Sequence, residues 1–148
     1  MVTRLLALFF VAATVGACTA SSPSALPGFS STTISIDDRE LTVAVADTPQ
    51  ARRQGLMGIT DLGELDGMLF VFDSEVRTGF WMKDTLIPLD IAFFDAEGLA
   101  VDRLLMVPCT VEECPTYKAA GPYRYAVEAP AGDLAFVGEG SALVLPDG

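Results

Sequence analysis

Short apolar runs, separated by glycine, proline and aspartate, dominate the chain from about residue 32 onward. Apolar and polar positions alternate in Ile34–Ile36 and Leu41–Val45, on either side of Asp37–Glu40, a pattern typical of a β-hairpin. Evenly spaced short strands favour a sandwich or a barrel, because such an arrangement buries one face of each strand. Further strands are predicted at residues 68–72, 79–82, 91–94, 99–107, 123–128 and 142–145, with a tight turn at 95–98.

Helical signals occur at two places. Thr48 can cap a helix, Pro49 suits the first helical position, and Gly55 or Gly58 can end the helix. A second short helix is predicted at Gly132–Val137. We therefore expect a mainly β fold, a compact antiparallel β-barrel or sandwich-like single domain with one or two short helices.

The first seventeen residues have a different pattern. Arg4 precedes an apolar run, Leu5–Val15, that is too short to anchor a folded protein across a bilayer, and this predicts a signal peptide over residues 1–17. The run ends in Val15-Gly16-Ala17-Cys18, which resembles the lipobox of bacterial lipoproteins. By that resemblance, cleavage leaves Cys18 as a lipidated N-terminus that holds the protein in a membrane. The alternative is an ordinary signal peptide followed by a chance cysteine.

Residues 18–31 combine the predicted lipidated cysteine with a segment rich in Ser, Ala, Pro and Gly that carries no charge. Such a composition predicts a flexible tether. The remaining residues, 32–148, form the predicted β-rich domain. We expect an extracytoplasmic, membrane-anchored bacterial lipoprotein that faces the periplasm or the cell surface.

Composition narrows the classes of function. The chain has 148 residues, of which 51% are hydrophobic, and this suits a single folded domain. With 20 acidic and 9 basic residues its net charge is -11, so we expect no binding to nucleic acid, which requires positive charge. The chain has no histidine, which excludes Ser-His-Asp and Cys-His catalysis and histidine-ligated zinc. The acidic surface favours cationic partners.

Two cysteines remain if Cys18 is lipidated. Cys109 and Cys114 form an even pair outside the cytoplasm, which predicts a structural disulfide. A reactive thiol pair is the alternative, but Glu112 and Glu113 would repel a thiolate.

Four methionines besides Met1 lie in or beside apolar segments. Thioethers are soft ligands that can hold Cu(I), so copper handling is one hypothesis. No close methionine pair and no histidine would complete such a site, and core packing explains the same positions. We therefore predict no metal site and no cofactor. The four residues are Met57, Met68, Met82 and Met106.

The densest polar cluster follows Phe80 and Trp81. If a strand ends near Lys83, the side chains of Lys83, Asp84, Thr85 and Asp90 can gather where the chain turns. This corner, beside the indole of Trp81, could bind a polar ligand, could act as a hydrolase or transferase site, or could be a structural turn. A second hypothesis is an aromatic platform for a sugar or a peptide, formed by Tyr117, Tyr123, Tyr125 and Trp81.

Several segments in a fixed order resemble the motif series of the bacterial and archaeal domain-of-unknown-function family 192. The resemblance extends from about Leu41 to Leu145. It implies a small β-rich domain with a short helix near its start, often exported or lipid-anchored, and no established reaction, cofactor or substrate. Family members often have Asn where this chain has Asp84. The matching segments are residues 53–58, 67–70, 80–85, 87–91, 108–109 and 114–117.

The resemblance also suggests a place for Arg53. The segment after the predicted helix could pack against the Trp81–Asp90 corner and bring the Arg53 guanidinium near Asp84 or Asp90, as a structural clamp or as the floor of a pocket for an acidic ligand. The chain shows no catalytic constellation. We therefore expect a non-enzymatic envelope module that binds a protein, a glycan or a small ligand. Its candidate binding residues are Arg53, Trp81, Lys83, Asp84, Thr85 and Asp90.

Overall fold

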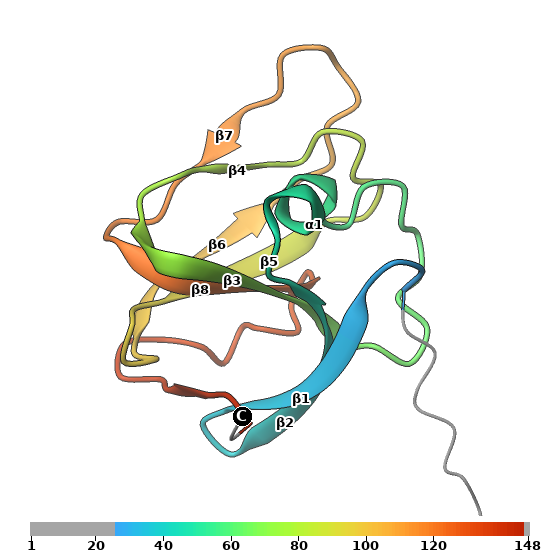
Figure 1. Ribbon diagram of the computed structural model, residues 1–148. Helices are drawn as coiled ribbons and strands as arrows, with labels where there is room; N and C mark the ends of the chain where they lie inside the picture. Colours follow the sequence, from blue (N-terminus) through green and yellow to red (C-terminus); the bar gives the residue numbers. More distant parts are fainter. Residues whose placement is uncertain (1–25, 147–148) are drawn as a thin grey trace, which may run out of the picture.

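A curled seven-stranded sheet forms most of the structure, and a two-stranded sheet and one short helix lie on one side of it (Figure 1). The computed structural model describes residues 26–146, so the predicted signal peptide and the predicted lipidation at Cys18 lie outside the described residues. The predicted mainly β class is confirmed. The elements are β1 (Ser30–Ile36), β2 (Arg39–Ala46), α1 (Pro49–Gln54), β3 (Gly67–Val76), β4 (Phe80–Trp81), β5 (Leu89–Phe94), β6 (Ala100–Met106), β7 (Thr116–Tyr117), β8 (Tyr123–Pro130) and β9 (Leu143–Val144).

The large sheet has the strand order β6-β5-β8-β3-β2-β1-β9, and β4 pairs with β7 in the small sheet. Adjacent strands are antiparallel except β2 and β3, which run parallel. The expectation of an antiparallel barrel or sandwich is therefore corrected at this pair. A parallel pair needs a long crossover connection, and residues 47–66, which include α1, provide one.

Local turn and cap signals predicted two features correctly. The hairpin β1–β2 turns through Asp37, whose φ of 55° lies in the left-handed region that Asp tolerates. Thr48 caps α1, since its hydroxyl accepts a hydrogen bond from the Ala51 backbone N–H at 3.1 Å. Gly55, at φ 48°, ends the helix.

The predicted second helix at residues 132–137 is wrong. The chain makes successive turns there, closed by backbone bonds such as Asp133 N–H to the Pro130 carbonyl at 3.0 Å and Val137 N–H to the Leu134 carbonyl at 3.0 Å. Gly132 has φ 100°, which lies outside the helical region. In addition, the Asp90 carboxylate accepts hydrogen bonds from the Gly132 and Leu134 amides, and these bonds fix the turns.

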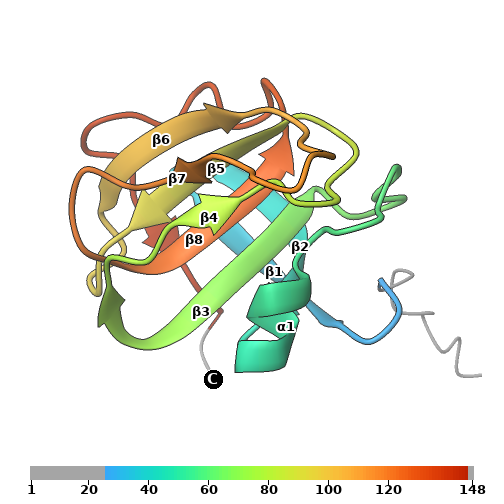
Figure 2. The same cartoon turned by 90° about the horizontal axis from the view of Figure 1, so that it is seen from above.

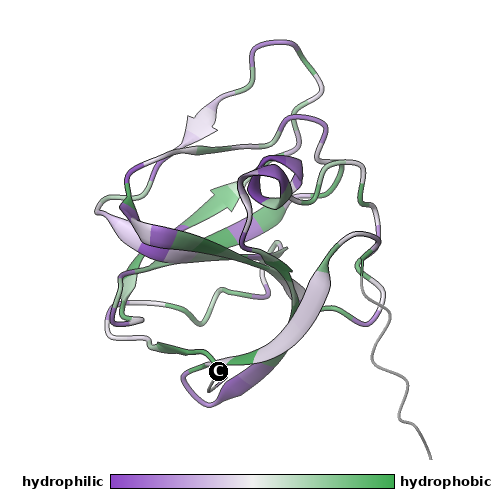
Figure 3. Cartoon of the chain, in the orientation of Figure 1, coloured by the Kyte–Doolittle hydropathy of each residue, from purple (hydrophilic) through white to green (hydrophobic). Residues whose placement is uncertain are grey.

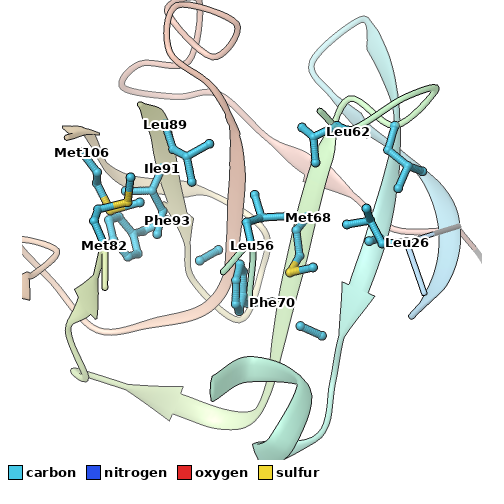
Figure 4. Close-up of a cluster of buried hydrophobic side chains, with 14 of the residues drawn as sticks. Leu26, Leu56, Leu62, Met68, Phe70, Met82, Leu89, Ile91, Phe93 and Met106 are labelled. Carbon is cyan, nitrogen blue, oxygen red and sulfur yellow. The ribbon is translucent and has the colours of Figure 1, made fainter. Parts of the chain in front are cut away.

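Two hydrophobic clusters lie on the two sides of the large sheet. The first, on the side of α1 and the small sheet, includes Phe70, Met82, Ile91 and Tyr123. Figure 4 shows Met82 and Met106 beside Ile91 and Phe93, with Leu56, Met68 and Phe70 further along the same cluster. The second cluster includes Ile34, Phe94, Val127, Leu134 and Leu143.

The predicted disulfide is confirmed: Cys109 and Cys114 are bonded, with their Cα atoms 5.9 Å apart. The bond closes a small loop next to β7, and the backbone N–H of Cys109 donates to the Met82 carbonyl at 3.3 Å. The disulfide thus closes the loop, and the Cys109 backbone bond holds it against the segment that follows β4. In the part of the chain that the structure describes, no helix is long and apolar enough to cross a membrane.

Candidate functional site

A pocket of about 380 Å³ opens between α1, β3 and β4, and we call it the α1 pocket. Figure 2 shows α1 beside β3, with β4 and β7 lying across the same side of the large sheet. A volume of this size suits a small organic ligand. The pocket is lined by Pro49, Arg52, Arg53, Gln54, Gly55, Leu56, Met57, Phe70, Phe72, Thr78, Gly79, Phe80, Trp81, Thr85 and Glu128.

Exposure differs between the two ends of the α1 pocket. Arg53 is exposed and Trp81 keeps 54% of its surface accessible, so these residues form the mouth. Thr85 and Glu128 are buried, with 4% and 5% of their surfaces accessible, so they form the floor. The pocket therefore leads from solvent to a buried hydroxyl and a buried carboxyl group.

Glu128 lies in β8, the strand between β3 and β5, opposite Met68 on one side and Ile91 on the other. Side chains of a strand alternate between its two faces, so Glu128 shares its face with Ala126, which belongs to the first cluster. Val127 and Ala129 point to the second cluster. The alternation of β8 thus directs a charged side chain to the bottom of the pocket.

The carboxyl group of Glu128 has no hydrogen bond or ion pair to any residue within 26–146. Every fully enclosed side-chain oxygen and nitrogen in that part of the chain has a partner, so the Glu128 carboxyl retains contact with the pocket space. Burial raises the pKa of Glu128 from 4.5 to about 8, because the charged form loses its hydration. A perturbed carboxyl group in a pocket is a candidate for function.

The two arginines of α1 that line the pocket have different surroundings. Arg52 donates to the backbone carbonyls of Asp47 at 2.6 Å and Val71 at 2.7 Å, and its guanidinium lies 4.9 Å from the centre of the Phe72 ring. The guanidinium of Arg53 has no such bond within the described chain. The predicted placement of Arg53 against Asp84 or Asp90 is not observed, since no ion pair joins them among residues 26–146. Arg53 remains at the mouth of the pocket, where it can meet a ligand.

Aromatic rings form much of the apolar wall. Phe70 and Phe80 meet edge to face with centroids 5.0 Å apart, and Phe80 also contacts Phe93 at 5.8 Å. The exposed indole of Trp81 completes this wall at the mouth. Packed rings of this kind give the pocket an apolar wall.

The predicted platform of tyrosines is wrong. Tyr123 is fully buried in the first cluster, donates to the Thr78 carbonyl at 2.8 Å and has a pKa that burial raises above 10.0. Tyr125 packs against the second cluster on the other side of the sheet. The register between β3 and β8 shifts between Val71 and Val76, and this irregularity breaks the alternation that would put both tyrosines on one face.

The structure does not bring the four residues of the predicted polar corner together. The Lys83 ammonium donates to the Val111 carbonyl at 3.0 Å and so holds the disulfide loop. Asp84 has φ 55°, and its backbone bonds the Gly58 N–H and the Cys109 carbonyl. Of the four, Thr85 alone lines the α1 pocket.

Asp90 lies on the side of the sheet opposite the pocket. Its neighbours Leu89 and Ile91 belong to the first cluster, so the Asp90 side chain points toward the second. The Asp90 carboxylate accepts from Gly132 N–H at 2.9 Å and Leu134 N–H at 3.2 Å, and the Arg103 guanidinium lies 3.6 Å away. These contacts give Asp90 a structural role.

The methionines have packing positions. Met68, Met82 and Met106 are buried in the first cluster, and Met57 lines the α1 pocket. Among residues 26–146 there is no group of three or more His, Cys, Asp or Glu side chains that could hold a metal ion.

Sequence analysis did not single out Glu128. The signal was present, since Glu128 stands in the middle of the apolar segment Ala126–Pro130, where an acidic residue is unusual in a central strand. Its importance depends on the pocket, which is built from segments that are distant in the sequence.

Comparison with known proteins places the chain among uncharacterised relatives. The model of the DUF192 family, described as an uncharacterized ACR family, matches residues 32–143. A protein of unknown function from Novosphingobium aromaticivorans DSM 12444 superposes with a TM-score of 0.70 at 25% identity, over 89% of this chain and 99% of that one. A protein from Sinorhizobium meliloti 1021 described as a "putative transcription regulator" gives 0.69 at 28% identity, over 78% and 93% of the two chains. No curated protein matches.

Proposed function

The chain belongs to the DUF192 family, and from its α1 pocket we propose that it is a non-enzymatic binding module of the cell envelope that holds a small organic ligand. One observation carries the proposal. Glu128 is a buried carboxyl group without a protein partner, and it lies at the floor of a cavity that is open to solvent at its other end. A ligand that bonds this group would supply the partner that the protein lacks.

The cost of keeping Glu128 in place supports a role in binding. Burying a carboxyl group without a partner destabilises a fold by several kcal/mol, whether the group is charged or becomes protonated. Sites that bind ligands retain such unfavourable groups, because the missing contact is made in the complex. The Glu128 carboxyl is matched by a buried Thr85 hydroxyl on the same floor.

The proposed location in the envelope has separate support. The signal-peptide pattern, the lipobox-like sequence at Cys18 and the uncharged segment that follows it all favour export and anchoring. The predicted tether of residues 18–31 ends earlier than expected, because Leu26 is buried in the first cluster and Ser30 begins β1. The Cys109–Cys114 disulfide is a bond that forms in oxidising compartments. Labelling with a radioactive fatty acid tests the anchor: the wild-type chain incorporates the label, and the Cys18→Ser chain does not. Equal labelling of both chains would contradict lipidation at Cys18.

The ligand is tested by recovery from the protein itself. The full-length chain is expressed with export, extracted from membranes in mild detergent and denatured, and the released small molecules are identified by mass spectrometry. We expect a compound that the wild type releases in proportion to protein.

Two tryptophan variants provide a matched comparison. Gln54 is an exposed residue lining the mouth, and Thr60 is exposed outside the pocket. Gln54→Trp obstructs the mouth and reduces the released compound, whereas Thr60→Trp leaves it unchanged. If the wild type releases no compound above the Gln54→Trp level, ligand binding in the α1 pocket is rejected.

A further inference from the structure

The α1 pocket presents opposite charges at its two ends. At the floor, Glu128 can carry a negative charge and has no partner in the described chain. At the mouth, Arg53 carries a positive charge and is likewise free of hydrogen bonds and ion pairs within residues 26–146. Arg52 is also positive, but backbone carbonyls and the Phe72 ring already occupy its guanidinium. The two unpaired groups thus lie at the buried and the exposed end of the same cavity.

Between these ends the walls are apolar and largely aromatic. Phe70, Phe72 and Phe80 line the pocket between the floor and the exposed Trp81. Flat or aliphatic groups pack well against such rings. A complementary ligand therefore has an apolar body, a polar group at each end, and a charge pattern opposite to that of the pocket.

Resting on the ligand-binding function proposed above, we propose that the α1 pocket takes a small amphoteric amine. Its primary ammonium group binds Glu128 at the floor and its apolar or aromatic body packs against the phenylalanine rings. Its carboxylate lies at the mouth beside Arg53. The Thr85 hydroxyl, buried at the same floor, accepts a further hydrogen bond from the ammonium group.

Electrostatics favours this orientation. An ammonium group next to a buried carboxylate is attracted more strongly than it would be in water, because the surroundings have a low dielectric constant. The net charge of -11 raises the local concentration of compounds with a cationic group. A simple anion would have to place its charge away from Glu128, and only the mouth offers it a partner.

The pH dependence of binding follows from the same contacts. Burial raises the pKa of Glu128 to about 8, so the carboxyl group must lose its proton before it pairs with an ammonium group. The other charged groups that line the pocket are Arg52 and Arg53, both on α1; β3 and β5 contribute apolar neighbours, including Met68 and Ile91. Affinity for an ammonium compound therefore rises about tenfold from pH 6 to pH 7 and about fivefold from pH 7 to pH 8.

Four related aromatic compounds test the proposal by calorimetric titration of the full-length protein in detergent. 4-(Aminomethyl)benzoate carries both charges, and benzylammonium lacks the carboxylate. 4-(Hydroxymethyl)benzoate replaces the ammonium by a neutral hydroxyl, and 4-methylbenzoate lacks any polar group at that end. We expect 4-(aminomethyl)benzoate to bind most tightly and the two compounds without nitrogen to bind most weakly.

Variants assign each charge to its partner. Glu128→Gln keeps the volume of the side chain, and we expect it to weaken 4-(aminomethyl)benzoate about thirtyfold at pH 8 and to abolish the pH dependence. Arg53→Gln is expected to weaken the same compound about threefold and to leave benzylammonium unchanged. The control is Glu64→Gln, which removes an exposed carboxylate outside the pocket and should change neither compound.

The possible outcomes test the amine class of the ligand separately from ligand binding by the α1 pocket. If Glu128→Gln still binds 4-methylbenzoate, the pocket of the variant is folded. Its weaker binding of 4-(aminomethyl)benzoate is then due to the missing charge of Glu128. Stronger binding of 4-(hydroxymethyl)benzoate than of its amine, or affinity that falls with rising pH, overturns the amine proposal. Absence of binding by all four compounds overturns it as well. If the purified protein nevertheless releases a compound without an amine, ligand binding stands and only the class is wrong.

Discussion

Asp90 and Glu128 are two buried carboxylates on adjacent strands, and they have opposite surroundings. In the pairing of β5 with β8, Asp90 is opposite Ala129, the residue that follows Glu128. Asp90 therefore lies on the same side of the sheet as Ala129, and the Glu128 side chain points to the other side. Asp90 has two backbone amides and Arg103 as partners, whereas Glu128 has none within the described chain. Their accessible fractions are 2% and 5%, so burial alone does not distinguish them.

Asp90 and Glu128 differ in their bonding partners, and these partners indicate the role of each buried group. The bonds of Asp90 fix the turns at residues 131–136, and Asp90 does not line the α1 pocket. Burial disfavours the charged form of Glu128, and the residue lines a pocket, which is the arrangement expected of a group kept for binding. The hydropathy view in Figure 3 shows β3 as hydrophobic along much of its length and hydrophilic at one end, and α1, the helix that borders this pocket, as hydrophilic.

The largest expected effect is the dependence of stability on pH that Glu128 imposes. Its pKa is about 8 in the folded protein and near 4.5 when unfolded, so the folded state binds the extra proton. Stability therefore falls as pH rises from 4.5 to 8, by up to about 5 kcal/mol. Glu128→Gln removes this loss. In urea unfolding, the variant therefore has a larger free energy of unfolding than the wild type at pH 8, and the two values approach each other near pH 4.5. A constant difference across this range would contradict the assigned surroundings of Glu128.

Asp90 should show the opposite behaviour. Asp90→Ala leaves the Gly132 and Leu134 amides without their acceptor, and we expect a loss of about 3 kcal/mol in urea unfolding at neutral pH. Asp90→Asn keeps an acceptor oxygen and should lose about 1 kcal/mol. If Asp90→Ala unfolds at the wild-type urea concentration, the carboxylate does not hold the turns, and the contrast with Glu128 fails.

Arg103 sharpens the comparison, because Asp90 has an arginine and Glu128 does not. The Arg103 side chain is 35% exposed and 3.6 Å from Asp90, so solvent screens the pair. Arg103→Gln should lower the free energy of unfolding by about 0.5–1 kcal/mol, and this loss should be smaller in about 1 M salt. The measurement is urea unfolding of both proteins at low and high salt. A cost that does not change with salt would indicate that Arg103 acts through packing.

The smallest expected effect is that of Arg53 on stability. Arg53 is exposed and unbonded within the described chain, so Arg53→Gln should change the free energy of unfolding by less than about 0.5 kcal/mol. Arg52→Gln provides the contrast, because Arg52 donates to two backbone carbonyls and should cost about 1–2 kcal/mol. Equal losses would mean that Arg53 is a structural residue rather than a free group at the mouth.

Features encoded by neighbouring residues could be predicted from the sequence. Alternation predicted the hairpin β1–β2, and Thr48, Pro49 and Gly55 predicted α1. The even pair Cys109 and Cys114, together with the expected export, predicted the disulfide. The motif series also resembled the family that the comparison then showed.

Features that depend on distant contacts were predicted less well. The turns at residues 131–136 replace the expected helix because Asp90, far away in the chain, holds their amides. The tyrosine platform fails because of an irregularity in the pairing of β3 with β8. Of the candidate binding residues, Arg53, Trp81 and Thr85 line the α1 pocket, and Lys83, Asp84 and Asp90 do not.

The sequence by itself determined the β-rich class, the short capped helix and the disulfide, because each depends on the conformational preferences or chemistry of nearby residues. Only the tertiary structure decided which polar groups share a space. β8 lies between β3 and β5, and α1 closes over the same side of the sheet, so Glu128 comes to the floor of a pocket whose mouth holds Arg53. The physical reason is that burial and the absence of a partner are properties of the packed chain, and no stretch of sequence around Glu128 contains them.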